Sequence, residues 1–410
     1  MENYKKIVIV GGGFGGIRAA LNLTEKQLPN TKIILISDKS HFEYHPALYR
    51  VITGRSPLEV CIPLREIFIG KNVETLEDTI IKVNLKEKLL EGSSGSRYSF
   101  DFLILALGSE TVYFNIPGIK EFSSGFKSIS EALRLKKHLH ELFNTDKKAV
   151  FEERVRAAHI IVVGGGASGT EIAGELAIYT KKLARNHKFD SSFITIDLIE
   201  AAPRLLLALP EDIARKVENR LHCLGVNIFL NRTVVKEDIE EVYLKDMEMK
   251  TKTVIWTAGI KPHRLYSQIE GLTLNNKGRV MIDEFLQAQG WNNIFIIGDA
   301  AATLYTGMAQ TATRDGQFVA EIIKRKLFGR QISLYQPKPP FYAIPVGPGW
   351  AAVMMGNLRF YGRIGWWFRR IADLRFFLSI LPWQKAISAF RSGKTLCESC
   401  TICLPEEIIN

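Results

Sequence analysis

A group of glycines near the start of the chain stands directly after a short apolar run. The run is Ile7–Val10, and a helix-like segment, Ile17–Leu23, follows the glycines. The glycines have the spacing G-x-G-x-x-G and are Gly11, Gly13 and Gly16. In such a strand–turn–helix unit the first glycine permits the turn, the second lets the backbone approach a phosphate, and the third lets the helix pack on the strand. The pattern predicts that a dinucleotide pyrophosphate binds at the N-terminus of the helix.

A carboxylate follows this turn at a distance that suits the same ligand. The next apolar run, Ile33–Ile36, ends just before Asp38. This is within the usual spacing of about 20 residues for a carboxylate that binds the ribose of a dinucleotide. Asp38 is therefore the expected acceptor for ribose hydroxyls. The alternative is a glycine-rich turn that binds no ligand. The presence of Asp38 at the expected spacing after the turn argues against that alternative.

The same pattern occurs a second time at His159–Gly169. Ile160–Val163 is the predicted strand, and Thr170–Ala177 continues as helix. The glycines of this turn are Gly164, Gly166 and Gly169. Another predicted strand, Ile194–Ile199, ends at Glu200, although the gap is longer than usual. Two such units in one chain indicate that two dinucleotides are held in one enzyme.

Other segments are predicted to place small and acidic residues at strand ends. Tyr98–Ser109 is a predicted buried strand with a small-residue turn, and Thr253–Trp256 is followed by Thr257, Ala258 and Gly259. Asn293–Ile297, followed by Gly298, Asp299 and Ala300, would return to the first fold as a late strand. The other predicted elements are a helix around 46–53, an antiparallel excursion over 73–91, helices at 129–143, 211–224 and 309–326, and a proline-rich linker at 337–345.

The composition is that of a globular protein with excess positive charge. The 410 residues suggest two or three domains, and the apolar fraction of 46% and charged fraction of 24% are ordinary. We expect no secretory signal before the first strand, and no run approaches the roughly 18 apolar residues of a spanning helix. The formal charge of +11 is not arranged as a nucleic-acid module. Five cysteines fit a reducing interior better than a disulfide framework.

Much of the positive charge lies near the C-terminus beside aromatic residues. Between residues 358 and 394, tryptophan and phenylalanine are interleaved with arginine, and Asp373 is the only acid. This composition suits the headgroup boundary of an anionic membrane. The segment predicts one or two amphipathic helices, broken near Pro382, that lie in the interface. A packing helix or a dimer contact is the alternative.

Three cysteines at the end of the chain have the spacing C-x-x-C-x-x-C. They are Cys397, Cys400 and Cys403. Such soft ligands suit zinc or a cluster, but a fourth ligand is missing nearby. Ordinary thiols in a mobile tail are the favoured interpretation, so no metal site is predicted.

The fold class predicted from these patterns is α/β, with two Rossmann-like dinucleotide-binding domains and a C-terminal amphipathic helical membrane-binding region. The first domain is discontinuous and comprises residues 1–118 and 263–335. The second comprises residues 119–262, and the C-terminal region comprises residues 336–410.

Taken together, these motifs resemble the type II NADH dehydrogenases, single-chain flavoproteins with two dinucleotide-binding domains. The matching pieces, in the order of the family, are VIVGGGFGG, HPALYRVITG, DFLILALGSET with IPG, VVGGGASGTEIAGELA, LIEAAPRLL, VIWTAG, NIFIIGDAA and MAQTATRDG. They cover roughly residues 5–330. The resemblance implies FAD in the first domain, NADH in the second, and electron transfer to a membrane quinone without proton pumping. Disulfide reductases and sulfide:quinone reductases need redox cysteines near the flavin, and neither suits this sequence.

For FAD, the resemblance assigns residues at three places in the chain. Those near the start of the chain are Gly11, Gly13, Phe14, Gly15, Gly16, Asp38, Lys39 and His45. Those in the middle and late segments are Ala106, Gly108, Asp299, Ala309 and Gln310. Asp299 would meet the ribityl or pyrophosphate region. Gln310 would bring the positive end of its helix toward the flavin pyrimidine, where negative charge builds on reduction; a plain surface glutamine is the alternative.

For NADH, the implied residues lie in and after the second glycine turn. They are Gly164, Gly166, Ser168, Gly169, Glu200, Ala258 and Gly259. Glu200 would accept from the ribose 2′-hydroxyl and repel a 2′-phosphate, so NADH is favoured over NADPH. The family places Glu171 near flavin and nicotinamide; the alternative is a carboxylate that complements the helix dipole.

The acceptor side departs from the family pattern. The family commonly has A-Q-x-A-x-Q, whereas this chain has Ala309, Gln310, Ala312 and then Arg314. Arg314 could donate to a quinone carbonyl or select another acceptor, so Glu171, Gln310 and Arg314 are the candidate catalytic residues. The first hypothesis is a peripheral NADH:quinone oxidoreductase on the cytoplasmic face of the cell membrane. The alternatives are an NADH reductase with a soluble protein acceptor and a nucleotide-sensing membrane adaptor with slow turnover.

Overall fold

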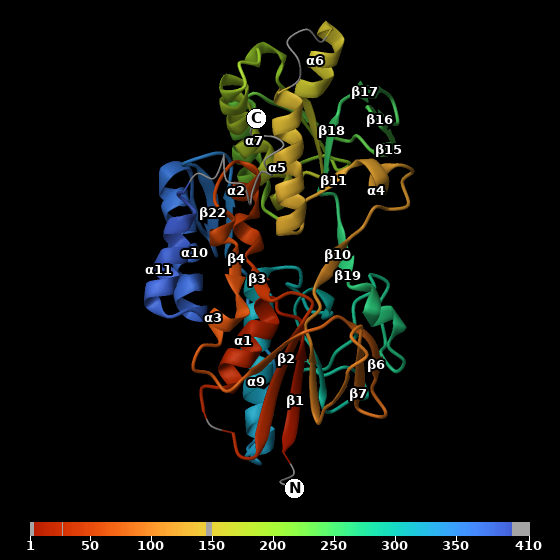
Figure 1. Ribbon diagram of the computed structural model, residues 1–410, viewed down its shortest axis with the longest axis vertical. Coiled ribbons are helices and arrows are strands. Elements are labelled where there is room, and N and C mark those ends of the chain that lie inside the picture. The colour runs from red at the N-terminus through yellow and green to blue at the C-terminus, as the bar shows by residue number, and fades with distance from the viewer. Residues whose placement is uncertain (1–3, 27, 145–149, 396–410) are drawn as a thin grey trace.

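The computed structural model describes residues 4–26, 28–144 and 150–395. Its lower half in Figure 1 is built on a five-stranded parallel sheet. In spatial order its strands are β20 (Ile294–Ile296), β9 (Phe102–Leu105), β1 (Lys5–Val10), β2 (Thr31–Ser37) and β5 (Glu74–Glu77). The inner strands are continuous apolar runs because helices and loops bury both faces of a parallel sheet. Strand β20 joins this sheet as a late strand, as the sequence predicts, and the structure pairs it with β9.

The upper half contains a second five-stranded parallel sheet (Figure 1). Its strands in spatial order are β11 (Ser124–Gly125), β18 (Thr253–Trp256), β12 (His159–Val163), β13 (Thr195–Ile199) and β14 (Val226–Phe229). The chain passes between the two sheets twice. We call the parts built on these two sheets the first fold and the second fold. Strand β10 (Ser109–Thr111) leaves the first fold and pairs antiparallel with β19 (Ile260–Pro262), which returns to it. The domain boundaries given in the sequence analysis remain predictions.

Helices pack on these sheets where the sequence has apolar stripes. In the first fold, α1 (Phe14–Leu23) packs closely against α9 (Ala309–Leu327). In the second, α7 (Ala167–Asn186) packs against α8 (Glu211–Leu224) and α5 (Ile129–Phe143). The bounds of α5 and α8 are those predicted. A capping box of Ser128 and Glu131 starts α5.

Smaller elements complete the two folds. The helical ones are η1 (His45–Ala47), α2 (Leu48–Ile52), η2 (Pro57–Glu59), α3 (Leu64–Ile67), α4 (Ile119–Phe122), α6 (Phe151–Ala158), η3 (Ser191–Phe193), η4 (Arg264–Gln268) and η5 (Gly298–Ala300). The strands are β3 (His41–Glu43), β4 (Cys61–Pro63), β6 (Ile80–Asn84), β7 (Leu89–Gly92), β8 (Arg97–Ser99), β15 (Val234–Asp238), β16 (Glu241–Leu244) and β17 (Glu248–Lys250). The predicted antiparallel excursion is the sheet β6–β7–β8, whereas β5 belongs to the main parallel sheet.

The C-terminal part is a small antiparallel sheet followed by two helices. The sheet contains β21 (Tyr342–Pro345), β22 (Ala351–Met355) and β23 (Leu358–Phe360). The predicted proline-rich linker is therefore wrong at its end, since its last four residues pair with β22. The helices α10 (Gly362–Ile380) and α11 (Trp383–Ser392) are separated at Pro382, as predicted. Cys397, Cys400 and Cys403 lie outside the described residues.

Helix α10 differs from a purely interfacial helix because it has a charged inner face. Arg369, Arg370 and Asp373 are buried, and Asp373 has no exposed surface. They meet Arg50 of α2 and Glu59 of η2; Arg50 lies 2.6 Å from Glu59 and 3.1 Å from Asp373. Burial alone would raise the pKa of Asp373, but the surrounding guanidinium groups lower it below its usual range. These basic residues of α10 therefore hold it to the first fold. In the described part of the chain, no helix is long and apolar enough to span a membrane.

Candidate functional site

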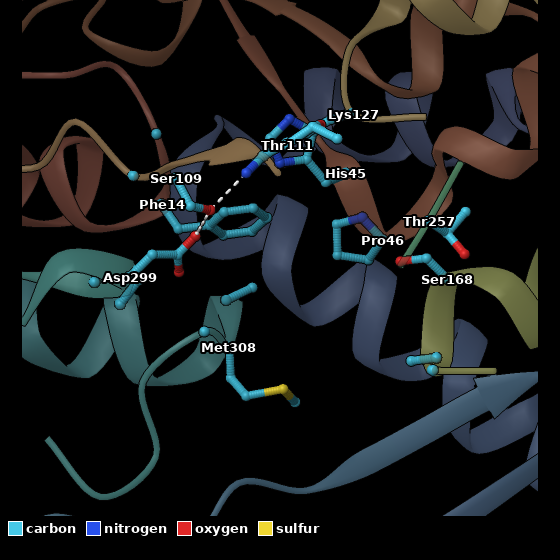
Figure 2. Close-up of a pocket in the computed structure, with 18 of the residues that line it drawn as sticks. Phe14, His45, Pro46, Ser109, Thr111, Lys127, Ser168, Thr257, Asp299 and Met308 are labelled. Atoms are coloured by element: carbon cyan, nitrogen blue, oxygen red, sulfur yellow. Dashed lines mark hydrogen bonds between the residues drawn. The ribbon is translucent and has the colours of Figure 1, made fainter. Parts of the chain in front are cut away.

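One large cavity of about 2330 Å³ lies at the carboxyl ends of both sheets. Its wall includes the glycine turns that follow β1 and β12, and residues that follow β9 and β18. Ligands of open parallel sheets bind at this edge, where the chain leaves the strands. The close-up in Figure 2 shows Asp299 and Ser109 on one side of the cavity and Ser168 and Thr257 on the other, with Pro46 between them.

The first glycine turn has the backbone of a phosphate cradle. Gly11 has φ of +115°, and a Cβ there would overlap the carbonyl of Ala106. A Cβ at Gly16 would overlap the carbonyl of Gly11, so helix and strand touch at this position. At Gly13, by contrast, a Cβ would meet nothing within 4 Å. Helix α1 begins at the next residue, so free N–H groups face an open space that suits a pyrophosphate.

The second glycine turn repeats this geometry. Gly164 has φ of +111°, and a Cβ at Gly169 would overlap the carbonyl of Gly164. A Cβ at Gly166 would meet nothing within 4 Å. Gly166 and Ser168 are exposed at the start of α7. This cradle is therefore open to a second dinucleotide.

Glu200 is held in one orientation beside the second cradle. Its Oε2 accepts from the N–H of Gly165 at 2.5 Å, and its Oε1 accepts from the N–H of Ala202 at 2.8 Å. Arg204 instead donates to the backbone carbonyls of Leu206 and Leu207, at 3.1 and 3.0 Å. A carboxylate faces the cavity here, while the nearby guanidinium is occupied by its own loop, which suits a free ribose 2′-hydroxyl better than a phosphate.

Two sequence-predicted residues, Lys39 and His45, lie beside a carboxylate, Glu43, that sequence reasoning missed. Asp38 is exposed at the end of β2, and Lys39 and His45 also line the cavity. The Nζ of Lys39 lies 2.9 Å from Glu43 Oε2, and the Nε2 of His45 lies 3.4 Å from it. Burial opposes ionisation of Glu43, yet hydrogen bonds from His45 and Lys39 lower its pKa to about 2. Glu43 thus orders both basic side chains.

A second missed residue reaches this site from the other fold. Lys127, just before α5, donates to Ser109 Oγ at 2.5 Å, and that hydroxyl donates to Asp299 (Figure 2). Burial lowers the pKa of Lys127, opposed by the charge of Asp299. Asp299 and the turn residues Ala106 and Gly108 line the cavity as predicted. The sequence around Lys127 is that of an ordinary helix start. Only its distant partners could therefore have identified Lys127 as a site residue.

Glu171 lines the cavity from the second turn of α7, because the helix begins at Ala167 and has no acidic residue in its first turn. Burial raises its pKa to about 8, against the opposing charges of Arg369 and Arg50. One turn later, burial raises the pKa of Glu175 to about 7. Because its pKa lies above 7, Glu171 is mostly protonated at neutral pH and can donate a hydrogen bond into the cavity.

The start of α9 also faces the cavity, but its polar side chains bind the chain itself. The Nε2 of Gln310 donates to the carbonyl of Phe341 at 2.8 Å, and its Oε1 accepts from the N–H of Phe341 at 3.1 Å. The Nη1 of Arg314 donates to the carbonyl of Lys338 at 2.7 Å. Ala309, Ala258 and Gly259 line the cavity as well. The structure therefore brings together the residues predicted for both dinucleotides.

Comparison with known proteins identifies the family of this chain. Residues 5–316 match the family model described as pyridine nucleotide-disulphide oxidoreductase. The chain is 30% identical to the type II NADH:quinone oxidoreductase Ndh of Mycobacterium tuberculosis, over 95% of this chain and 89% of that protein. The chain belongs to the type II NADH:quinone oxidoreductases. The Haemophilus influenzae type II NADH:quinone oxidoreductase is 31% identical over 73% of this chain and 74% of its own length.

A solved structure has the fold of this type II NADH:quinone oxidoreductase chain. NDH2 from Plasmodium falciparum, solved in complex with NADH, superposes with a TM-score of 0.86. The match covers 96% of this chain and 98% of that one, at 20% identity. The fold of that structure therefore extends over 96% of this chain.

Proposed function

We propose that this protein oxidises NADH through bound FAD and passes two electrons to a membrane quinone, without proton pumping. The observation that carries the proposal is the single cavity lined by both glycine turns. Two dinucleotides bound at Gly13 and Gly166 would share that space, and hydride transfer requires the two reacting rings to be held together. When bound, FAD supplies the acceptor for the hydride of NADH and the donor of two electrons to the quinone.

The residues of the chain have distinct roles in this proposal. Gly13 and Gly166 admit the two pyrophosphates, and Glu200 orients the ribose of NADH. Asp299, supported by Ser109, meets the ribityl region of FAD. Glu171 keeps a proton at the cavity wall, where a reduced quinone needs protons.

The cavity also reaches the C-terminal region, which supports a quinone as the acceptor. Tyr342 and Ile344 line it from the small sheet, Phe341 lines it from the residue before β21, and Phe376 lines it from α10. These apolar walls suit the ring of a quinone better than a polar acceptor. Arg314 is the residue that suggests the alternative of a soluble protein acceptor. Its Nη1 instead donates to carbonyls of the chain itself, so this nitrogen gives that alternative no support.

One face of α10 supports a peripheral membrane location. Ile364, Trp367 and Ile371 are 61, 68 and 56% exposed and have the spacing of one helical face. Arg363 and Arg375 are exposed on the same helix, and each basic residue near an anionic leaflet contributes about 1 kcal/mol. Ile371 also lines the cavity, so the apolar face adjoins the place where a quinone would enter. We place this face on the cytoplasmic leaflet.

The activity is tested by steady-state turnover of the purified, FAD-loaded protein. With NADH as donor, a short-chain quinone should be reduced rapidly, and ferredoxin-like proteins should not. Fast turnover with protein acceptors alone would establish the soluble-acceptor alternative. A bound flavin that NADH bleaches only slowly would favour the nucleotide-sensing adaptor, and a protein that cannot bind FAD would contradict all three.

The membrane face is tested by sedimentation with anionic liposomes. Deleting α10 would also remove Asp373 and Arg369 from the core, so surface substitutions are needed. The triple variant with Ile364, Trp367 and Ile371 changed to serine should lose most of its pelleting. Ile239→Ser is the control, because Ile239 is 77% exposed in the second fold. A triple variant that pellets like wild type but sediments as a smaller species would assign this face to a homodimer contact.

A further inference from the structure

A segment without regular structure runs beside α9 toward the cavity. We call residues 331–341 the strap; it connects the end of α9 to β21. Pro337, Pro339 and Pro340 fall within it. A proline has no backbone N–H, so this stretch cannot form a strand ladder, and its carbonyls need donors from elsewhere.

Side chains of α9 supply partners along the whole strap. At the far end of the helix, Arg325 donates to the carbonyl of Gln331 at 2.9 Å. In the middle, Asp315 accepts from the hydroxyl of Tyr335 at 2.5 Å. The strap therefore follows the helix backward, from its C-terminal end to the N-terminal end that faces the cavity.

The last two contacts are made by Gln310 and Arg314, one helical turn apart. The Nη1 of Arg314 donates to the carbonyls of Lys338 and Pro339, at 2.7 and 3.2 Å. The carboxamide of Gln310 both donates to and accepts from the backbone of Phe341. Arginine suits this place because its guanidinium carries several donors at the end of a long side chain.

The strap ends in the wall of the cavity. Phe341 and the following Tyr342 line it, and Tyr342 begins β21. Strand β21 and its partner β22 pack against α10, the helix with the exposed apolar face. The strap therefore joins α9 to the strands that pack against α10.

We infer that Arg314, with Gln310, is a positioning residue for the acceptor: it fastens the strap to α9 and so sets the shape of the acceptor pocket. The inference rests on the proposed function, because it concerns how the quinone is bound. It assigns a role to the residue at which this chain departs from the A-Q-x-A-x-Q pattern. A direct donor to the quinone is the competing role, and the two make different predictions.

The test compares four forms of the full-length, FAD-loaded protein with wild type. They are Arg314→Ala, Arg314→Gln, Arg314→Lys and the matched control Arg325→Ala, which removes the same residue type from the other end of the strap. Each is measured for KM and kcat with a short-chain quinone and for hydrogen–deuterium exchange of the peptide spanning 336–344. A lost hydrogen bond from a charged donor predicts a rise in quinone KM of about tenfold for Arg314→Ala.

The exchange measurement and the conservative variants separate the two roles. Exchange of the Phe341 and Tyr342 amides should speed up in Arg314→Ala and stay unchanged in Arg325→Ala. Glutamine is two bonds shorter and should behave like alanine, whereas lysine should recover most of the loss in KM. A raised KM without faster exchange, or full recovery by glutamine alone, would overturn the inference in favour of direct contact.

Failure of the proposed function has a separate signature. If wild type reduces no quinone, the function is wrong, while the exchange comparison still tests whether Arg314 fastens the strap. If wild type turns over quinone and Arg314→Ala changes neither KM nor exchange, the inference alone is wrong.

Discussion

At the first glycine turn, Phe14 packs against Phe42 and Phe376, with ring centroids 4.9 and 5.0 Å apart, whereas at the second turn Ala167, the matching residue, and Ser168 are exposed. Each turn follows a parallel strand, each has the glycine spacing G-x-G-x-x-G, and each has free space above its middle glycine. Aromatic rings from three parts of the chain cover the first helix start, and α10 supplies one of them. The difference suits a cofactor that stays bound at the first turn and a substrate that enters and leaves at the second.

The sharpest way to break this comparison is to add one methyl group to each cradle. A Cβ at Gly13 or Gly166 meets no protein atom within 4 Å, so both alanine variants should fold normally. Gly13→Ala should lose FAD on gel filtration, with binding weakened about a hundredfold as the methyl group fills the pyrophosphate space. Gly166→Ala should keep its flavin and show a KM for NADH raised to a similar extent. Flavin loss from both variants would show that the turns are not specialised.

Removing the aromatic cover should affect the first turn and leave the second unchanged. Phe376→Ala should destabilise the protein by about 2–3 kcal/mol, below the value for a fully buried phenylalanine, and should speed the release of FAD. The KM for NADH should stay near that of wild type. Denaturant unfolding and the rate of flavin loss measure the two effects. Unchanged flavin retention would mean that Phe376 supports only the fold.

The carboxylate of the second turn should set the choice between NADH and NADPH. Glu200→Gln removes the charge and leaves the shape, so the KM for NADH should rise about tenfold through the loss of charge-assisted hydrogen bonds. The KM for NADPH should fall, because repulsion of the 2′-phosphate is relieved. Asp38→Asn is the matched change at the first turn and should leave the ratio of the two KM values unaltered. An unchanged ratio in Glu200→Gln would remove Glu200 from the specificity site.

The smallest expected effect is the pH dependence of Glu171. Its pKa is about 8 in the fold and about 4.5 when unfolded, so the folded protein keeps a proton that the unfolded chain releases. Its contribution to stability is therefore complete below pH 4.5 and is lost as the pH rises to about 8. Glu171→Gln keeps a neutral group at every pH. The thermal midpoint of the variant minus that of wild type should therefore be larger at pH 8.5 than at pH 5, by about 2–4 °C. Glu270→Gln changes an exposed carboxylate, and its midpoint should differ from that of wild type by the same amount at both pH values. The same pH-independent difference for Glu171→Gln would show that the Glu171 carboxyl is in contact with water.

Most of the fold could be predicted because its signals are local. Gly11 and Gly164 need their positive φ in order to turn, and the apolar runs beside them are long and continuous enough to indicate buried parallel strands. The strands of the small C-terminal sheet escaped prediction since three prolines hide the start of β21, and the pairing with β22 is its main support.

The site could be predicted only where its residues belong to those local patterns. Lys127 is linked to Asp299, 172 positions away in sequence, through the hydroxyl of Ser109, and Glu43 is identified only by the basic groups around it. The same limit applies to Arg370, which the tail composition assigned to a membrane face and which lies instead 2.7 Å from Glu59. Long-range ion pairs leave no periodicity in the sequence, so tertiary structure is needed to find them.

The late arrival of β20 has a consequence for the way this protein is made. Residues 5–105 emerge first from the ribosome, but the edge of their sheet beside β9 stays unpaired until Ile294–Ile296 have been synthesised. The middle segment meanwhile contains every strand of its own sheet. A nascent chain should therefore complete its second sheet before its first, and a chaperone that protects exposed strand edges should act on the N-terminal hundred residues.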